Sequence, residues 1–309
     1  MHTKIKKLKV GTRGSDLALF QTRFVVGELK KQFPDLEIEE IIVSTVGDRD
    51  KTTALRQVGG EGLFIKEIES ALLDLRIDLA VHSLKDMPVE DNEGLITAAI
   101  PVRASWHDIF ISKEFKCLAD LPPSAKIGTG SARRKSQLNW SFPGMEILPI
   151  RGNVGTRINK VRIGEVDGII IAEAGLRRLG DHLADDLFVE VLDSDIMLPA
   201  AGQGAIAVQT RSDALGIVSI LSSIHDSEIA QVVNGERSFL SGVEGGCHTP
   251  VGALGHLKNG KFFLEAVIAP DEDSFLIRLS AEQQDDETST ETAFKLADEA
   301  KMWLGAADS

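Results

Sequence analysis

The chain has 309 residues, of which 43% are hydrophobic and 26% charged, enough to bury the cores of two or three domains. Its formal net charge of -13 argues against a nucleic-acid-binding protein, because binding phosphates requires a basic surface. No apolar run approaches the roughly 18 residues of a membrane span, and the lysines of residues 1–10 precede no signal-peptide core. We therefore expect a cytoplasmic protein that binds neither nucleic acid nor a membrane.

Strand and helix patterns alternate over the first hundred residues, which predicts βαβ units and a parallel sheet. Strands are expected at 5–11, 36–44 and 78–81, and helices at 17–33 and 63–75.

The alternation restarts after Pro122 and Pro123, which predicts a second α/β lobe. Both lobes open on similar turns, Gly-Thr-Arg-Gly-Ser at 11–15 and Gly-Thr-Gly-Ser at 128–131, as in a duplicated architecture. A later strand at 205–209 is expected to return to the first sheet, giving two hinge strands. In the second lobe, strands are expected at 126–128, 146–150 and 167–172, and helices at 131–140 and 154–163.

The last third of the chain has a different pattern, typical of a small α+β domain with an antiparallel sheet. Helices are expected at 213–224, 228–240 and 288–304, and strands at 251–257, 262–268 and 275–280. The predicted domains are 1–101 with 203–222, then 102–202, and finally 223–309.

Arginines are concentrated in the loops that follow predicted strands. Helix N-termini and the carboxyl ends of parallel strands attract anions, and guanidinium groups add bidentate recognition. Because no phosphate-loop motif is present, carboxylates are the better candidate ligands. Any single arginine could equally be a surface charge paired with one of the 47 acidic residues. The arginines concerned are Arg13, Arg133, Arg134, Arg151, Arg157, Arg177 and Arg178.

Two segments could carry chemistry. Lys85 and Asp86 directly follow a predicted strand, so Asp86 could be an acid/base group, a stabiliser of a cationic intermediate, or part of an exposed ion pair. Cys247 lies in an irregular Gly- and Pro-containing segment next to His248, and could be either a reactive thiolate or an inert thiol. Cys117 has the apolar neighbours of a buried thiol. Neither cysteine has the spacing of a disulfide framework or a metal site.

The order of eight motifs resembles the porphobilinogen deaminase family over essentially the whole chain. These motifs are Gly-Thr-Arg-Gly-Ser-Asp-Leu-Ala-Leu at 11–19, Gly-Gly-Glu-Gly-Leu-Phe at 59–64, Ala-Val-His-Ser-Leu-Lys-Asp-Met-Pro at 80–88, Ala-Arg-Arg at 132–134, Arg-Gly-Asn-Val-Gly-Thr-Arg at 151–157, Ala-Gly-Leu-Arg-Arg-Leu-Gly at 174–180, Leu-Pro-Ala-Ala-Gly-Gln-Gly-Ala at 198–205 and Glu-Gly-Gly-Cys at 244–247.

The resemblance implies a monomeric transferase, a hydroxymethylbilane synthase of haem and tetrapyrrole biosynthesis. Such an enzyme condenses four porphobilinogen molecules head to tail on a dipyrromethane cofactor, releasing ammonia, and then hydrolyses off hydroxymethylbilane. The implied fold is two periplasmic-binding-protein-like (type II) α/β lobes joined by two hinge strands, plus the small C-terminal α+β domain. No metal is implied.

Site residues follow from the same resemblance. It implies that Cys247 holds the cofactor through a thioether and that Asp86, with Lys85, is catalytic. The other implied cofactor contacts are Ser83, Lys85, Asp86, Thr129, Ser131, Arg133, Arg134 and Arg157. The implied substrate contacts are Arg13, Ser15, Phe64, Arg151, Arg157 and Arg178, with Phe64 packed over a pyrrole ring.

The chain departs from the family pattern at a few positions, and two other functions stay open. Glu173 stands where a small residue is common, and residues 104–108 are less acidic than usual. Gly130, Ala132 and Thr249 also differ from the pattern. One alternative is a non-enzymatic type II anion-binding or ligand-sensing protein. The other is an acyltransferase or hydrolase in which Cys247 is the nucleophile.

Overall fold

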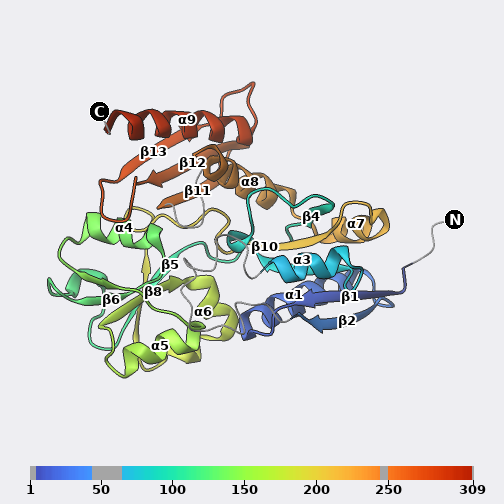
Figure 1. Ribbon diagram of the computed structural model, residues 1–309, viewed down its shortest axis with the longest axis horizontal. Helices are drawn as coiled ribbons and strands as arrows, with labels where there is room; N and C mark the ends of the chain where they lie inside the picture. Colours follow the sequence, from blue (N-terminus) through green and yellow to red (C-terminus); the bar gives the residue numbers. More distant parts are fainter. Residues whose placement is uncertain (1–4, 44–64, 244–249, 308–309) are drawn as a thin grey trace. The chain divides into compact units, whose positions relative to one another are not determined.

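The computed structural model of the chain describes residues 5–43, 65–243 and 250–307, which form two compact units (Figure 1). Unit 1 comprises Met1–Arg103 and Ala205–Ala230, and unit 2 comprises Ala104–Gly204 and Gln231–Ser309. The chain therefore passes between the units after Arg103, after Gly204 and after Ala230. The division into three domains stays a prediction.

Unit 1 contains a five-stranded sheet in the order β2-β1-β3-β10-β4. The strand β10 runs against its neighbours β3 and β4, whereas β1 is parallel to β2 and β3. The parallel pairing predicted for the first hundred residues is confirmed for β1, β2 and β3, and β10 returns to this sheet as predicted; its antiparallel direction was not predicted, because a strand's own apolar pattern does not encode direction. The strands are β1 (Lys7–Thr12), β2 (Glu37–Ile42), β3 (Leu79–Ser83), β4 (Leu95–Ala99) and β10 (Ile206–Arg211).

Helices cover both faces of this sheet. On one face, Val25 and Leu29 of α1 (Asp16–Gln32) and Leu221 of α7 (Leu215–Leu221) join a core with alternate residues of β1, β3 and β10. On the other face, α3 (Lys66–Leu73) packs Ile68 and Leu72 into a second core. Burial on both faces explains why these strands are rich in apolar residues.

Unit 2 repeats this strand arrangement in the order β7-β6-β8-β5-β9. Again one strand, β5, runs against its neighbours β8 and β9, and β6 is parallel to β7 and β8. The duplicated α/β architecture is thus present down to the reversed fourth strand. The strands are β5 (Asp108–Ser112), β6 (Lys126–Gly128), β7 (Glu146–Leu148), β8 (Gly168–Ala172) and β9 (Phe188–Leu192).

Side chains of this sheet alternate between two cores. Phe110 and Ile170 face Leu138 of α4 (Ala132–Ser141). Their neighbours along the strands pack against α5 (Val154–Arg162) and α6 (Glu173–Leu179). These two helices lie on the other side of the sheet from α4 (Figure 1).

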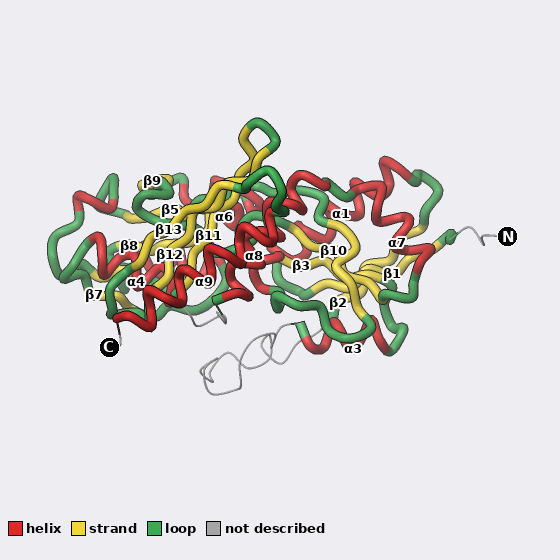
Figure 2. The backbone as a smooth tube through the Cα atoms, turned by 90° about the horizontal axis from the view of Figure 1, so that it is seen from above, coloured by secondary structure: helices red, strands yellow, loops and turns green. Residues whose placement is uncertain are grey.

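The C-terminal part of unit 2 is a three-stranded antiparallel sheet in the order β11-β12-β13 (Figure 2). One face packs on helices through Phe239, Phe262 and Leu296. The other face contacts Leu198 and Trp106 through Leu254 and Val267, which joins this sheet to the rest of unit 2. The elements are α8 (Ser227–Gly242), β11 (Val251–Lys258), β12 (Lys261–Ile268), β13 (Ile277–Glu282) and α9 (Ser289–Ala307).

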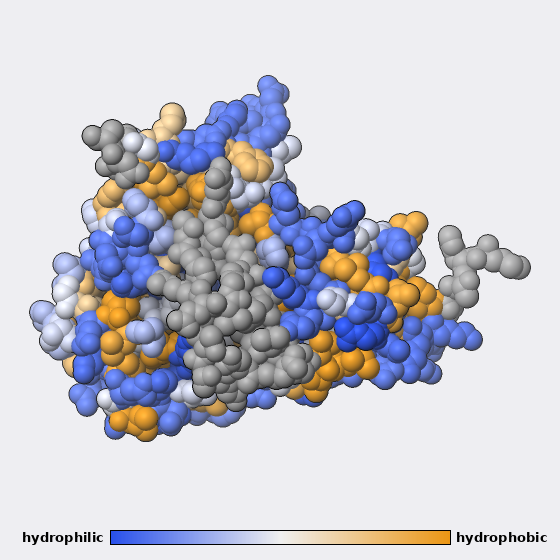
Figure 3. Space-filling model, viewed as in Figure 1, coloured by the Kyte–Doolittle hydropathy of each residue, from blue (hydrophilic) through white to orange (hydrophobic). Residues whose placement is uncertain are grey.

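Hydrophilic side chains cover much of the face shown in Figure 3, with apolar patches between them. Among the described residues, no helix is both long and apolar enough to cross a membrane.

Gly204 closes the turn before β10 under tight steric limits. Its φ is +87°, and a Cβ there would lie 2.5 Å from the carbonyl oxygen of Ala104 and 2.7 Å from that of Ser105. Gly260, in the β11–β12 turn, also has a positive φ of +78°, but no atom lies within 4 Å of its Cβ position.

We therefore expect Gly204→Ala to lower the free energy of unfolding by at least about 2 kcal/mol more than Gly260→Ala, because only the former adds a backbone clash to the φ strain. Urea unfolding of both variants measures this difference. Equal losses would show that the turn at Gly204 relaxes freely.

Candidate active site

In unit 1, the predicted site residues follow two neighbouring parallel strands. Arg13 and Ser15 come directly after β1, and Lys85 and Asp86 lie in a single 3₁₀ turn, Leu84–Asp86, directly after β3. Because β1 and β3 are paired and parallel, both groups lie at the same edge of the sheet. Ligands bind at this edge in open α/β sheets.

The backbone of the turn that carries Asp86 is anchored to the sheet of unit 1, whereas the carboxylate of Asp86 remains exposed. The Leu84 side chain is buried, and its backbone N–H donates to the carbonyl of Ala205 at 3.0 Å. Ser83 and Gln21 of α1 are joined by a 2.8 Å hydrogen bond between Gln21 Nε2 and Ser83 Oγ. Asp86 is exposed and Lys85 half-buried. The structure thus holds an accessible carboxylate on an anchored backbone.

Ser15 also has a structural role, as the N-cap that its position before the predicted helix 17–33 indicates. Its hydroxyl caps α1 by accepting a hydrogen bond from the N–H of Ala18 at 3.4 Å. An N-cap of this kind stabilises the start of the helix beside Arg13.

Behind this edge lies a buried histidine, His82, on β3. Its Nε2 is buried and has no hydrogen-bond partner among the described residues. The pKa of His82 is lowered to about 4, chiefly because burial disfavours the imidazolium; the charge of Arg13 also lowers it, and Asp91 and Gln209 oppose the shift. His82 is therefore neutral at physiological pH.

In unit 2, the predicted residues also gather at the carboxyl ends of parallel strands. Thr129 and Ser131 follow β6, Arg151 follows β7, and α6 follows β8 directly. Ser131 caps α4 through the N–H of Arg134, and Asn153 caps α5 through the N–H of Thr156 at 2.9 Å. The positive ends of α4 and α5 thus lie at this edge, which favours anions there.

Three arginines at this edge differ in exposure. Arg151 is exposed, whereas Arg157 is half-buried and its Nε donates to the carbonyl of Gly152 at 2.8 Å. Arg178 donates to the carbonyl of Gly204 at 2.6 Å. Burial lowers the pKa of Arg178 to about 10, so it remains a cation at neutral pH. Arg177, in contrast, forms surface ion pairs with Glu173 and Asp181.

Arg133 and Arg134 are buried, at 5% and 6% exposure, which excludes their interpretation as surface charges. Both pair with one carboxylate, Asp108, which is 0% exposed. Burial alone would raise the pKa of Asp108, but the two guanidinium groups hold it well below its usual range. Asp108 was not among the predicted residues, and its only sequence signal is an acidic residue directly before the apolar run Ile-Phe-Ile.

Ser105 and Glu173, which lie at positions that depart from the family pattern, are joined by a hydrogen bond. Ser105 Oγ donates to Glu173 Oε2 at 2.5 Å and lies 3.0 Å from Nδ1 of His107. Arg177 donates to the other carboxylate oxygen of Glu173 at 3.1 Å. The buried Glu173 thus has polar partners on both sides, which offsets the cost of its burial.

The predictions for Cys247 and Phe64 fall outside the described residues. Cys117 is half-buried rather than buried, and a hydrogen bond with Asp120 raises the pKa of its thiol. The prediction of a buried thiol was wrong because it rested on the apolar residues next to Cys117 in sequence, whereas the thiol contacts Asp120, three residues later.

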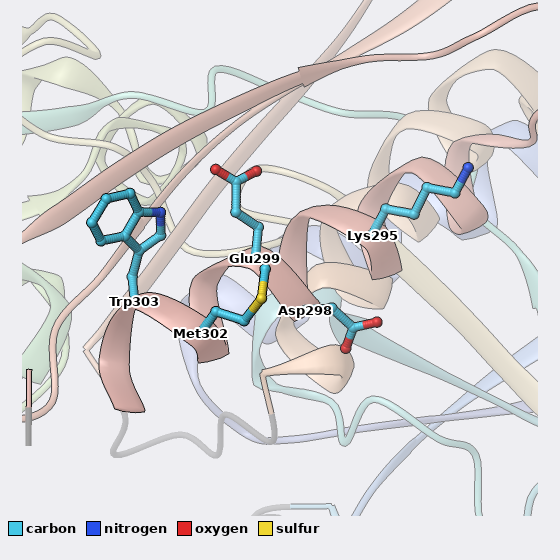
Figure 4. A pocket seen from close by; sticks show the side chains of 5 residues that line it. All are labelled: Lys295, Asp298, Glu299, Met302 and Trp303. Carbon is cyan, nitrogen blue, oxygen red and sulfur yellow. The ribbon is translucent and has the colours of Figure 1, made fainter. Parts of the chain in front are cut away.

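A surface pocket elsewhere contains none of the predicted residues. It lies on α9 and is lined by Lys295, Asp298, Glu299, Met302 and Trp303 (Figure 4). Among the described residues, no cluster of His, Cys, Asp and Glu side chains is suited to hold a metal ion.

The two five-stranded sheets, each with one reversed strand and with basic and hydroxyl residues at the carboxyl ends of its parallel strands, define a protein with two α/β lobes. Among solved structures, the chain matches the methionine-binding protein MetQ at 13% identity and a TM-score of 0.46, covering 73% of this chain and 92% of that chain. The periplasmic VFT2 domain of Bordetella pertussis BvgS matches at 17% identity and a TM-score of 0.43, covering 76% and 91%.

The family is identified by sequence. The model of the porphobilinogen deaminase dipyrromethane cofactor binding domain matches residues 8–218, and that of the porphobilinogen deaminase C-terminal domain matches residues 230–302. The porphobilinogen deaminase of Staphylococcus carnosus is 44% identical over 269 residues, covering 86% of this chain and 87% of the relative. That of Clostridium novyi is 42% identical over 275 residues, covering 89% and 92%. The chain therefore belongs to the porphobilinogen deaminase family.

Family membership confirms the predicted transferase class, hydroxymethylbilane synthase, and the dipyrromethane cofactor. It does not favour the alternative of a non-enzymatic binding protein. The roles of individual site residues stay predictions.

The low pKa of His82 makes stability depend on pH. An unfolded histidine titrates near pH 6.5, so protons bind the unfolded chain more readily between that value and about pH 4. We expect the free energy of unfolding to fall by up to about 3 kcal/mol from this group as the pH drops through that window.

Urea unfolding across the window tests this expectation with two variants. His82→Gln should remove this component, whereas His256→Gln, at an exposed site, should retain it. A pH profile for His82→Gln that is parallel to that of the wild type would contradict the assignment.

Proposed function

We propose that this chain condenses four porphobilinogen molecules head to tail on a dipyrromethane primer attached to Cys247, releasing ammonia, and then releases hydroxymethylbilane by hydrolysis. The observation that carries the proposal is the exposed Asp86 on an anchored turn, at the same strand edge as Arg13. We further propose a cytoplasmic monomer that binds neither nucleic acid nor a membrane, in line with the net charge of -13.

The described residues fit a polycarboxylate ligand. Each porphobilinogen carries an acetate and a propionate, so a growing chain accumulates negative charge. Guanidinium groups match carboxylates in bidentate geometry, and the N-termini of α4 and α5 favour the same charge. Primer contacts are assigned to Ser83, Lys85, Thr129, Ser131, Arg133, Arg134 and Arg157. Substrate contacts are assigned to Arg13, Ser15, Phe64, Arg151, Arg157 and Arg178.

Asp86 would act on charge that develops during the reaction. Porphobilinogen loses ammonia from its protonated aminomethyl group and becomes a cationic azafulvene. Its methylene carbon then bonds to a pyrrole α-carbon, which gives up a proton. A carboxylate beside the pyrrole N–H groups stabilises this positive charge most strongly in the transition state. The bound dipyrromethane supplies the pyrrole on which the first substrate is added.

Cys247→Ser should fold but carry no stable primer, because a serine hydroxyl is far less nucleophilic than a thiolate at neutral pH. Intact mass after expression gives the readout: the wild type should exceed its sequence mass by two pyrrole units, and the variant should not. Cys117→Ser is the matched control and should keep the primer. A primer mapped to Cys117, or an unmodified wild type that lacks turnover, would contradict the proposal.

Replacement of Asp86 separates charge from position. Asp86→Asn should keep the primer yet lose about 100-fold or more in turnover, the typical effect of removing one preorganised electrostatic group. Asp86→Glu keeps the charge one methylene away and should retain more activity. Steady-state turnover of porphobilinogen, measured for both variants after their primer content is confirmed by mass, shows whether the charge of Asp86 or its exact position matters more. Near-normal turnover in a fully primed Asp86→Asn enzyme would exclude a catalytic role for Asp86.

A further inference from the structure

Asp108 lies where an acid is least expected. It is the first residue of β5, paired in register with Ala172, the last residue of β8. Since β5 runs against β8, Asp108 lies at the carboxyl edge of the parallel strands. An unpaired carboxylate at this edge would repel an anionic ligand.

Each oxygen of Asp108 accepts hydrogen bonds from arginine. Oδ2 accepts one from Arg133 Nη1 at 2.8 Å. Oδ1 accepts two from Arg134, from Nη2 at 2.7 Å and from Nε at 3.2 Å, and a third from Gln203 Nε2 at 3.0 Å. One carboxylate thus fixes two guanidinium groups, and the cluster retains one positive charge in excess.

The two arginines use their donors differently. The third nitrogen of Arg134, Nη1, donates to the carbonyl of Ile170 at 3.1 Å, so all its nitrogens have partners within the unit. Within the described part of the chain, Arg133 donates only through Nη1, to Asp108 and to the carbonyl of Leu198 at 2.6 Å. Its buried Nε has no partner among the described residues. The unused donor capacity of the cluster therefore lies mainly on Arg133.

We propose that Asp108 is a positioning residue that ties Arg134 into the interior and orients Arg133, so that the excess positive charge of the cluster binds a carboxylate of the primer. The inference rests on the proposed function and adds a residue to it. Asp108 touches neither primer nor substrate; it acts through the guanidinium groups.

The proposal and simple electrostatics predict opposite results for Asp108→Asn. If Asp108 only weakens the positive field, its removal should leave primer binding intact or strengthen it. If Asp108 positions Arg133, the primer-bearing fraction of folded protein should fall by about tenfold or more, the effect of losing one charge-assisted hydrogen bond. Intact mass gives this fraction, and urea unfolding gives the stability of the same sample.

A control of similar destabilisation separates positioning from stability. Ile111→Ala removes a buried side chain from the same strand, three residues after Asp108, that packs in the core with Ile158 rather than in the core that contains Leu138 of α4, the helix of both arginines. It should be destabilised yet keep its primer. Should Asp108→Asn not fold, Asp108→Glu, which keeps the charge but shifts it by one methylene, should fold with a reduced primer fraction.

Full primer occupancy in Asp108→Asn, or in Asp108→Glu if only that variant folds, would overturn the proposal, as would an equal loss of primer in Ile111→Ala. A wild type that itself lacks primer and turnover would instead show that the proposed function is wrong.

Discussion

Placing a guanidinium group in a protein interior is costly unless a carboxylate shares the interior with it, and this requirement shapes the edge of unit 2 at which its parallel strands end. Asp108 meets it for two arginines at once, because β5 begins at the edge where β8 ends. Carbonyl oxygens of Leu198 and Ile170 accept further guanidinium N–H groups. The start of α4, the reversed strand and the segment before Gly204 are therefore held by one electrostatic centre.

The two lobes share one topology but place different polar groups at the carboxyl ends of their parallel strands. Both have a reversed fourth strand and both place polar residues after parallel strands. In unit 1 these residues include the exposed carboxylate of Asp86, whereas in unit 2 they are guanidinium groups, hydroxyls and helix N-termini. This division matches a reaction that must hold many carboxylates and also stabilise a transient cation.

Much of the fold could be predicted from strongly periodic segments such as those of α1, α4 and β12. The strands β4, β5 and β9 were missed. Because β5 is buried on both faces, its three central residues, Ile-Phe-Ile, form an apolar run without alternation, which does not distinguish a strand from part of a helix. The site residues could be assigned to strand ends, but the pairing of Asp108 with residues 25 and 26 positions later could not, since no local spacing encodes it.

The position of β10 in its sheet constrains how the chain can fold as it is synthesised. This strand lies between β3 and β4, yet it follows the entire β5–β9 sheet in sequence. On the ribosome, the second sheet can therefore be completed while the first still has a gap between two of its strands. Until β10 emerges, β3 and β4 both have unpaired backbone edges, the kind of surface that promotes association between nascent chains. The order of the strands along the chain thus allows the sheet of unit 2, which starts later, to be completed before the sheet of unit 1.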